Sequence, residues 1–208
     1  MNIPYNPIFN FIKNTCKQFD IDESHGIKHS MEVFDFSYSI LQSESKNNPD
    51  LLGKEKIIYT AALLHDMCDN KYMDEEVGIN TIKQFLITDL EYNNAEINAI
   101  LDIIGTMSYS KVKKNGFPDL GEYQMAYHIV READLLAAYD IDRCIIYTMM
   151  KNNVTYEDAF IEAKLLYYHR MGQHIVDGLF TFDSSKKMAV ELNEIEQQKI
   201  KYLNKMFQ

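Results

Sequence analysis

The chain has 208 residues, of which 46% are hydrophobic and 25% charged, a composition typical of one soluble globular domain with its own core. Its net charge of −10, with no basic cluster beyond Lys111, Lys113 and Lys114, repels the phosphates of duplex nucleic acid and argues against that partner. A small anionic ligand stays open, provided that a local positive centre captures it.

The cysteines and the apolar runs bear on the compartment. Cys16, Cys68 and Cys144 lie far apart and fit neither a zinc-type spacing nor a disulfide framework, which favours a reducing interior. The N-terminal stretch lacks a basic region followed by an apolar run, and no apolar run approaches the roughly 20 residues that span a bilayer. We therefore expect a cytoplasmic protein without a membrane partner, either a monomer or a homodimer.

Apolar residues recur at helical spacing from the start of the chain. They predict a first helix over about 7–19, and a second that ends before residue 47. One side of the second helix carries Met31, Phe34, Tyr38 and Leu41. A third helix over about 54–69 contains an apolar run that leads into His65 and Asp66.

Acidic residues at 74–76 suit the start of a fourth helix, which is expected to turn Val77, Ile82 and Leu86 inward. Asn93 is a predicted cap for a fifth helix. The buried side of this fifth helix is expected to carry Ile97, Ile100, Leu101 and Ile104.

Residues 106–121 form one long stretch without a helical pattern, and such loops are often functional, disorder being the alternative. Its lysines, Lys111, Lys113 and Lys114, are placed to gate a site. Helical patterns follow from 122 to about 139 and on through 149. A capping box at 155–158 then opens a helix through about 170.

The last part of the chain contains two glycines, Gly172 and Gly178, that are expected to interrupt a helical segment. A final amphipathic helix starts at Asp183, with Met188, Leu192, Ile195 and Leu203 at helical intervals. No strand alternation or internal repeat is present. The prediction is an all-α fold, with residues 1–208 forming a single compact helical domain.

Two carboxylates are predicted to lie in apolar helices: Asp66 after an Ala-Ala-Leu-Leu-His run, and Asp134 before Leu-Leu-Ala-Ala. Burying a carboxylate without a partner is very unfavourable. Together with His29 and His65 they offer two imidazoles and two carboxylates, which helix packing can bring to one divalent cation. The alternatives are that Asp134 pairs with Arg131 or a lysine, and that His29 is an ordinary core or surface histidine.

The ordered set of His29, His65-Asp66 and Asp134 resembles the ligand pattern of the HD-domain superfamily of metal-dependent phosphohydrolases. The segments 24–30, 61–66 and 132–136 resemble the corresponding segments of that family, and the resemblance covers about 22–140. It implies an all-α fold of the HD-domain type, with these four residues as ligands of one divalent metal ion. Candidate ions are Mn, Fe, Co, Ni, Zn or Mg, and the nitrogen–oxygen donor set makes Ca a poorer fit.

A metal held in this way lowers the pKa of bound water from about 15.7 toward about 7 and polarises a phosphoryl group. The resemblance therefore implies a phosphohydrolase that cleaves a phosphate ester or anhydride of a small metabolite, with a nucleotide as the first candidate. Two alternatives stay open. One is a nucleotide-binding or regulatory module with low turnover, and the other is a (p)ppGpp hydrolase.

Further residues are candidates for the surroundings of the metal. Asp69 shares one side of the predicted helix with His65 and Asp66 and is a candidate for activating water, unless it is a helix-end charge in solvent. His25 is a candidate for contacting a phosphate or donating a proton, unless it is a loop histidine. Candidates for holding a substrate anion are Lys28, Lys71, Arg131 and Arg143, although most surface Lys and Arg have no such role.

The sequence also departs from the family. Met107-Ser108 stands where related sequences often have His-Ser, and only His128 lies between the His-Asp pair and Asp134. His169 and His174 follow Asp134 and fit no two-metal pattern. These departures favour a single metal and argue against oxygenase chemistry, and they leave open whether full turnover is retained.

Overall fold

The computed structural model describes residues 3–207, so residues 1–2 and 208 and the side chain of Ile175 lie outside the description. Within that range the chain forms ten α-helices and two short 3-10 helices, without a strand. The helices are α1 (Tyr5–Phe19), α2 (Ile27–Glu44), η1 (Pro49–Leu51), α3 (Glu55–Leu64), α4 (Glu75–Thr88), α5 (Asn94–Thr106), α6 (Tyr109–Asn115), η2 (Gly121–Tyr123), α7 (Gln124–Ala137), α8 (Ile141–Asn152), α9 (Tyr156–Val176) and α10 (Asp183–Met206). The all-α prediction is confirmed.

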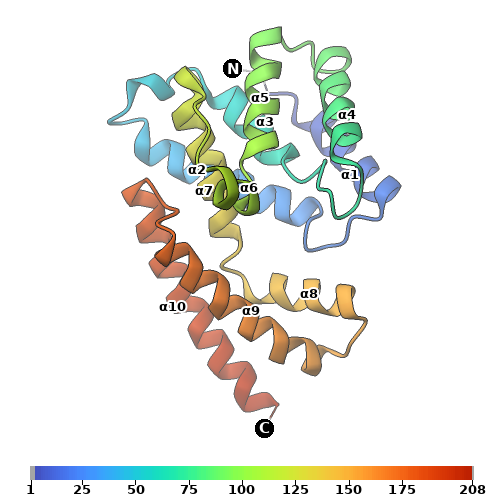
Figure 1. Cartoon of the computed structure of the whole chain (residues 1–208), viewed down its shortest axis with the longest axis vertical. Helices are drawn as coiled ribbons and strands as arrows, with labels where there is room; N and C mark the ends of the chain where they lie inside the picture. Colours follow the sequence, from blue (N-terminus) through green and yellow to red (C-terminus); the bar gives the residue numbers. More distant parts are fainter. Residues whose placement is uncertain (1–2, 208) are drawn as a thin grey trace.

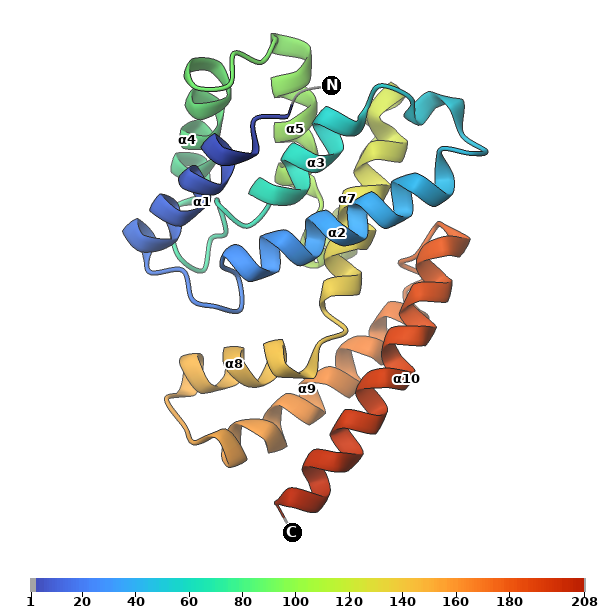
Figure 2. The same ribbon diagram turned by 180° about the vertical axis from the view of Figure 1, so that it is seen from behind.

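Helix α7 links the two ends of the molecule (Figures 1 and 2). It packs against α2 and α3 on one side, and its C-terminal end leads into the hairpin of α8 and α9. The long helix α10 runs alongside α9, and its N-terminal end returns to α2, where the Ser184 hydroxyl donates to Glu44. The C-terminal helices thus close back onto the first half of the chain.

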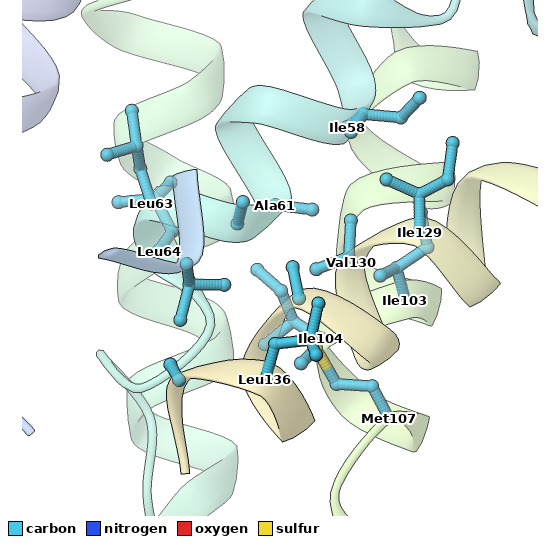
Figure 3. Close-up of a cluster of buried hydrophobic side chains, with 14 of the residues drawn as sticks. Ile58, Ala61, Leu63, Leu64, Ile103, Ile104, Met107, Ile129, Val130 and Leu136 are labelled. Atoms are coloured by element: carbon cyan, nitrogen blue, oxygen red, sulfur yellow. The ribbon is translucent and has the colours of Figure 1, made fainter. Parts of the chain in front are cut away.

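The core is built around α3, in which every residue from Ile57 to Leu64 is buried. Figure 3 shows α3 side chains such as Ala61 beside Ile104 of α5 and Val130 of α7. The same hydrophobic cluster continues through the C-terminal helices by way of Phe160 and Leu203. One continuous core is what a single domain requires.

Two predicted helix starts are confirmed with their caps. The Asp74 side chain accepts from the backbone N–H of Val77 at the start of α4. Asn93 and Glu96 form a reciprocal capping box at the start of α5. Among the residues expected to face inward, Ile82 is buried as predicted, whereas Val77 is 52% exposed because it sits in the first turn of α4, outside the packed face.

The buried face of α2 agrees with the prediction only in part, since Leu41 is buried as expected but two of the other residues are not. Met31 and Tyr38 are about half exposed, while the small polar residues Ser30 and Ser37 are fully buried. Small side chains allow close packing of neighbouring helices, and α2 packs closely against α7. A prediction from apolar spacing alone does not take the contact with α7 into account, and it therefore places the buried side of this helix incorrectly.

Several helix boundaries also differ. The third helix ends at Leu64 and not near 69, because residues 65–68 form turns. The stretch 106–121 is not irregular throughout, because it contains α6. Gly172 lies within α9, and only Gly178, with φ of +59°, marks a break before α10. None of the described helices has the length and apolar character needed to cross a membrane.

Candidate metal centre

Four side chains from three parts of the chain meet at one point. His29 lies in the first turn of α2, His65 and Asp66 follow the last residue of α3, and Asp134 lies on α7. The Nε2 atoms of His29 and His65 are 3.1 Å apart. The predicted ligand set is therefore brought together in space.

The carboxylates complete this cluster. Asp66 Oδ2 lies 3.3 Å from His29 Nε2, and Asp66 Oδ1 lies 3.3 Å from His65 Nε2. Asp134 Oδ1 lies 3.3 Å from His29 Nε2 and 3.6 Å from His65 Nε2. Donor atoms held at about 2.0–2.2 Å from one ion, at tetrahedral or octahedral angles, lie about 2.8–3.6 Å from one another. The imidazole–carboxylate separations fall in this range, and His29, His65 and Asp66 offer ligand atoms that all lie within 4.8 Å of one another. Asp134 contacts both imidazoles but does not belong to that tighter group.

Hydrogen bonding prepares His65 as a ligand. Its Nδ1 lies 2.8 Å from the carbonyl oxygen of Ala62, which can only accept, so Nδ1–H is the donor. In the neutral ring the lone pair is then on Nε2, which is directed at the cluster. A second hydrogen bond of this kind is usual for metal-binding histidines, because it fixes the tautomer and the ring orientation.

Three observations show how strongly charge is concentrated at this buried cluster. Asp66 Oδ2 is buried and has no hydrogen-bond partner, although His29 lies beside it. Burial alone would raise the pKa of Asp66, yet the imidazoles of His65 and His29 lower it well below its ordinary value. Burial opposes the charged form of His65 as well, and Asp66 and Asp134 nevertheless raise its pKa well above the ordinary value. The residues present thus fit a divalent ion.

A close helix contact holds the turn that carries His65 and Asp66. Gly78 of α4 lies so near that a Cβ at this position would be 2.6 Å from the Cβ and 2.7 Å from the Cα of Cys68. Only glycine allows α4 to approach the turn so closely. Packing against α4 therefore fixes the backbone from which two of the four ligands project.

The cluster lies at one wall of a cavity of 320 Å³. Asp66 and Asp134 line it, together with Asp69 from the turn after α3 and Ser108 and Ser110 from the start of α6. The opposite wall comes from α8 and α9 and presents Arg143, Tyr147, His169, Arg170, Gln173 and His174. A cavity of this size is at the lower end of those that hold small metabolites.

His25, one of the predicted candidates, lines this cavity and is held by a hydrogen-bonded network. The hydroxyls of Ser24 and Tyr72 donate to the two oxygens of Asp22, at 2.5 and 2.6 Å. The same two hydroxyl oxygens lie 2.7 and 3.0 Å from His25 Nδ1. Because their protons go to Asp22, the oxygens accept from Nδ1–H, and His25 keeps its lone pair on Nε2.

The remaining nitrogen of His25 contacts the ammonium group of Lys71 at 3.0 Å, and both residues line the cavity. Burial lowers the pKa of His25 to about 4, with Asp66 opposing this shift and Lys71 adding to it. His25 is therefore neutral at pH 7 and presents an acceptor, not a proton, to the cavity. This argues against the expected role as proton donor and leaves the role of acceptor.

Lys71 and Asp69, both predicted candidates, lie side by side at the edge of the cavity. Lys71 Nζ is 3.2 Å from Asp69 Oδ2, and the Lys71 backbone N–H donates to Asp69 Oδ1 at 2.9 Å. Asp69 does not share a helix face with His65, contrary to the prediction, because residues 65–68 form turns. Asp69 reaches the cavity through the turn geometry instead.

Arg143 of α8 reaches the metal ligands directly. Its Nε donates to the Ser24 carbonyl oxygen at 2.6 Å, its Nη2 lies 3.0 Å from His29 Nε2, and Nη2 is 4.0 Å from Asp66 Oδ2. The guanidinium thus supplies positive charge at the carboxylates. It also interacts with a ring nitrogen that a metal would use.

Two predicted anion-binding residues are not brought to the cavity. Lys28 is largely exposed and forms ion pairs with Glu32 and Asp140, at 3.1 and 3.6 Å. Arg131 is 2% exposed and faces into the interior, where its Nη2 lies 3.0 Å from Glu132 Oε1. Neither side chain lines the cavity, so both candidates are corrected to structural roles: one at the surface and one in the core.

The lysines of the 106–121 stretch do not line this cavity, although Lys111 lines a smaller neighbouring one together with His65 and Asp66. Lys111 pairs with Glu75, and Lys113 contacts Gln173 and lies 3.9 Å from Asp177. The contribution of this stretch to the cavity comes from Ser108, Tyr109 and Ser110 instead. Met107, at the position where histidine was considered, is buried in the hydrophobic core.

Of the wall formed by α8 and α9, the sequence predicts Arg143, which does line the cavity. It gives no signal for Tyr147, Arg170 and Gln173, and His169 and His174 fit no two-metal pattern. Their place at the cavity depends on how the C-terminal helices fold back on α7. The adjacent His169 and Arg170 are the one local feature that could have indicated a binding wall, and their position relative to the other candidates matches no known ligand spacing.

Comparisons with known proteins add a fold-level result. No protein-family model and no curated protein matches the chain. A crystal structure of a Lactobacillus plantarum protein, a Northeast Structural Genomics target, is similar over 97% of this chain and 95% of that one, with a TM-score of 0.66 and 17% identity. At this identity the similarity shows a shared fold alone.

Proposed function

We propose that this protein is a metal-dependent phosphohydrolase of the HD-domain type, acting on a small phosphorylated metabolite and most readily a nucleotide. The observation that supports this best is the convergence of His29, His65, Asp66 and Asp134, with donor separations of 3.1 to 3.6 Å, on a cavity that also contains cationic side chains. One divalent ion of the Mn, Fe, Co, Ni, Zn or Mg series is the proposed cofactor.

When bound, such an ion lowers the pKa of a water molecule and withdraws charge from a phosphoryl group. Arg143 and Lys71 complement this chemistry from the protein side. Both present N–H donors to the cavity and can hold phosphoryl oxygens while charge builds up on them. The carboxylates of Asp66 and Asp134 orient the ligand set, since each lies within 3.6 Å of an imidazole.

His25 is placed to accept a hydrogen bond from a water molecule or a substrate hydroxyl in this scheme. It is neutral at pH 7, its Nε2 carries the lone pair, and it lines the cavity next to Lys71. A pKa of about 4 makes the imidazole a weak base, so its role is to orient the water and not to remove its proton. Binding of an anion to Lys71 would free Nε2 for this task.

One observation favours the alternative of a nucleotide-binding module with low turnover. Arg143 Nη2 lies 3.0 Å from His29 Nε2, the lone pair that a metal requires. If this contact persists in solution, a metal has to compete with the guanidinium for His29. The alternative of a (p)ppGpp hydrolase would use the same site residues, so only the choice of substrate in the assay distinguishes it.

The test combines metal analysis with a substrate panel on one preparation of the full chain. The panel holds nucleoside mono-, di- and triphosphates, ppGpp and simple phosphomonoesters, with Mn, Co or Ni added. We expect about one metal per chain and release of phosphate or pyrophosphate. Asp66→Ala should abolish the metal signal and lower turnover by at least about a thousandfold, because several kcal/mol of charge stabilisation is lost.

Asp35→Ala, on the exposed side of α2, is the matched control and should leave metal content and turnover unchanged. Circular dichroism establishes that both variants are folded. A nucleotide that raises the melting temperature of the metal-loaded protein but survives overnight favours the binding module. Metal-loaded protein that neither binds nor cleaves any compound of the panel contradicts both functions.

A further inference from the structure

The wall of the cavity formed by α8 and α9 differs in charge from the metal end. The three carboxylates that line the cavity, Asp66, Asp69 and Asp134, belong to α7 or to the turn after α3. The lining residues from α8 and α9 include Arg143 and Arg170 but no carboxylate. In Figures 1 and 2 α8 lies across from the start of α2, so this wall faces the metal end.

Arg170 is the least neutralised cation of this wall. Arg143 is engaged by Ser24 and His29, and Lys71 by Asp69. In contrast, no aspartate or glutamate of the described chain forms an ion pair with Arg170, although acidic residues outnumber basic ones by 31 to 21. A half-buried guanidinium without an anionic partner, facing a cavity, is available for a ligand.

Further cations gather around Tyr147, which lines the same wall. The Arg170 guanidinium carbon lies 6.0 Å from the centre of the Tyr147 ring, Lys71 Nζ lies 5.9 Å from it, and Lys151 Nζ lies 5.4 Å from it. Three positively charged groups thus surround one ring, of which Arg170 and Lys71 line the cavity and Lys151 is exposed to solvent. The positive potential of these groups favours an anion beside the ring.

The balance of formal charge points to a second anion. At the metal end, the three negative charges of Asp66, Asp69 and Asp134 would be neutralised by a divalent ion and by one positive side chain, either Arg143 or Lys71. The second of these two side chains would then bind the phosphoryl group that reacts. Arg170 then has no acidic counterpart in an ion pair among the described residues 3–207, and it is left for a second anionic group.

We infer that Arg170, supported by Lys151 and Tyr147, forms a second anion-binding position for the substrate, so that the substrate class is one with two or more linked phosphoryl groups. This inference rests on the proposed function for the identity of the first position. The planar guanidinium offers paired N–H donors to a phosphoryl or pyrophosphoryl group. Arg170 acts here as a specificity-determining residue, outside the segment 22–140 that carries the family resemblance.

The test measures binding and turnover separately, with the metal-loaded full chain. Adenosine mono-, di- and triphosphate serve as probes by calorimetry, and inorganic phosphate and pyrophosphate serve as probes without a nucleoside. We expect the diphosphate and pyrophosphate to bind about tenfold more tightly than their monophosphate counterparts, as one charged hydrogen-bonded contact provides. Arg170→Ala should remove this difference and change monophosphate binding less than about twofold.

Arg170→Lys keeps the charge but not the planar donors and should retain part of the preference. Lys201→Ala, on the exposed side of α10, removes the same charge far along the chain and should change nothing. If Arg170→Ala does not fold, as judged by circular dichroism, the comparison of wild type with Arg170→Lys decides. Equal affinity of the wild-type protein for mono- and diphosphate, or equal weakening of both by the Arg170 variants, overturns the inference.

The outcomes separate this inference from the proposed function. A preference for longer phosphate chains that depends on Arg170, without hydrolysis of any probe, supports the second position and contradicts the hydrolase. Hydrolysis without such a preference supports the hydrolase and contradicts the second position. The absence of all binding contradicts both.

Discussion

The two walls of the cavity are built in different ways. At the metal end, His29 and His65 are almost fully buried, and their positions are fixed by the core helices α2 and α3 and by hydrogen bonds such as that from His65 to Ala62. On the other wall, Arg170 is half-buried and His169 is exposed, and both project from a hairpin at the edge of the fold. The fold thus gives most rigidity to the side that would hold a metal.

This difference corresponds to two proposed functions, metal binding at one wall and ligand selection at the other. Groups that hold a metal must keep their geometry within a fraction of an ångström, and core helices provide this. Groups that select a ligand need contact with solvent, and the half-buried Arg170 and exposed His169 have it although α9 also contributes to the core. The two walls are nevertheless connected, and the connection can be broken at named residues.

The strongest connection is Glu132, a fully buried carboxylate on α7. It accepts from the backbone N–H of Thr181 at 2.7 Å and from that of Phe182 at 3.3 Å, and it lies 3.0 Å from Arg131 Nη2. Glu132→Ala should lower the free energy of unfolding by about 3–5 kcal/mol, because it leaves a buried guanidinium unpaired. Denaturant unfolding measures this.

The exposed Glu191 provides the control, since Glu191→Ala should change the free energy of unfolding by less than about 0.5 kcal/mol. Glu132→Gln preserves the shape and part of the hydrogen bonding and should lie between the two. A loss below about 1 kcal/mol for Glu132→Ala would show that the segment 181–182 is not held through this carboxylate.

The metal end can be perturbed through Gly78. A methyl group at this position meets the Cα of Cys68, a backbone atom that cannot swing away. Gly78→Ala should therefore lower the free energy of unfolding by about 1–3 kcal/mol, the usual effect of overpacking, and should weaken metal binding because the turn with His65 and Asp66 is displaced. Thermal melting with and without metal measures both.

Gly105 is the matched comparison, because it lies inside α5 and a Cβ there has open space. Gly105→Ala should raise the free energy of unfolding by about 0.5–1 kcal/mol, since alanine favours the helix over glycine. Opposite signs for the two Gly→Ala variants would support the close contact. Equal effects would refute it.

The metal end was also the part that could be predicted from the sequence. His65-Asp66 and Asp134 stand out as polar residues in apolar runs, and their order in the chain together with His29, which resembles the pattern of a known family, makes them candidate ligands. The helix caps at Asp74 and Asn93 are likewise local, since each involves residues within one turn. Local signals of this kind can be recognised in the sequence without knowledge of the tertiary structure.

The other wall could not be predicted, because its members acquire their position through long-range packing. Arg131 and Arg143 look alike in sequence, yet one is buried beside Glu132 and the other reaches His29. The rotation of α2 that buries Ser30 and exposes Met31 depends on the contact with α7. Nothing in the spacing of these residues distinguishes the two outcomes.

The smallest expected effect concerns His128, which lies on α7 beside Arg131. Its Nδ1 is 3.3 Å from Arg131 Nη2 and its Nε2 is 3.0 Å from the Gln124 amide nitrogen. Burial, together with Arg131, lowers the pKa of His128 to about 4. Between about pH 6.5 and pH 4 the unfolded chain therefore binds a proton that the folded protein does not.

Stability should consequently fall as the pH falls through this window, with a slope of at most about 1.4 kcal/mol per pH unit from His128. His25 and His174, whose pKa values burial also lowers to about 4, act in the same direction. His128→Asn removes one of the three contributions, so its unfolding free energy should depend less steeply on pH than that of the wild type. The exposed His169 is the control, because His169→Asn should leave the slope as it is. A slope that His128→Asn does not reduce would mean that this imidazole is already protonated in the folded protein, and that Arg131 does not face it.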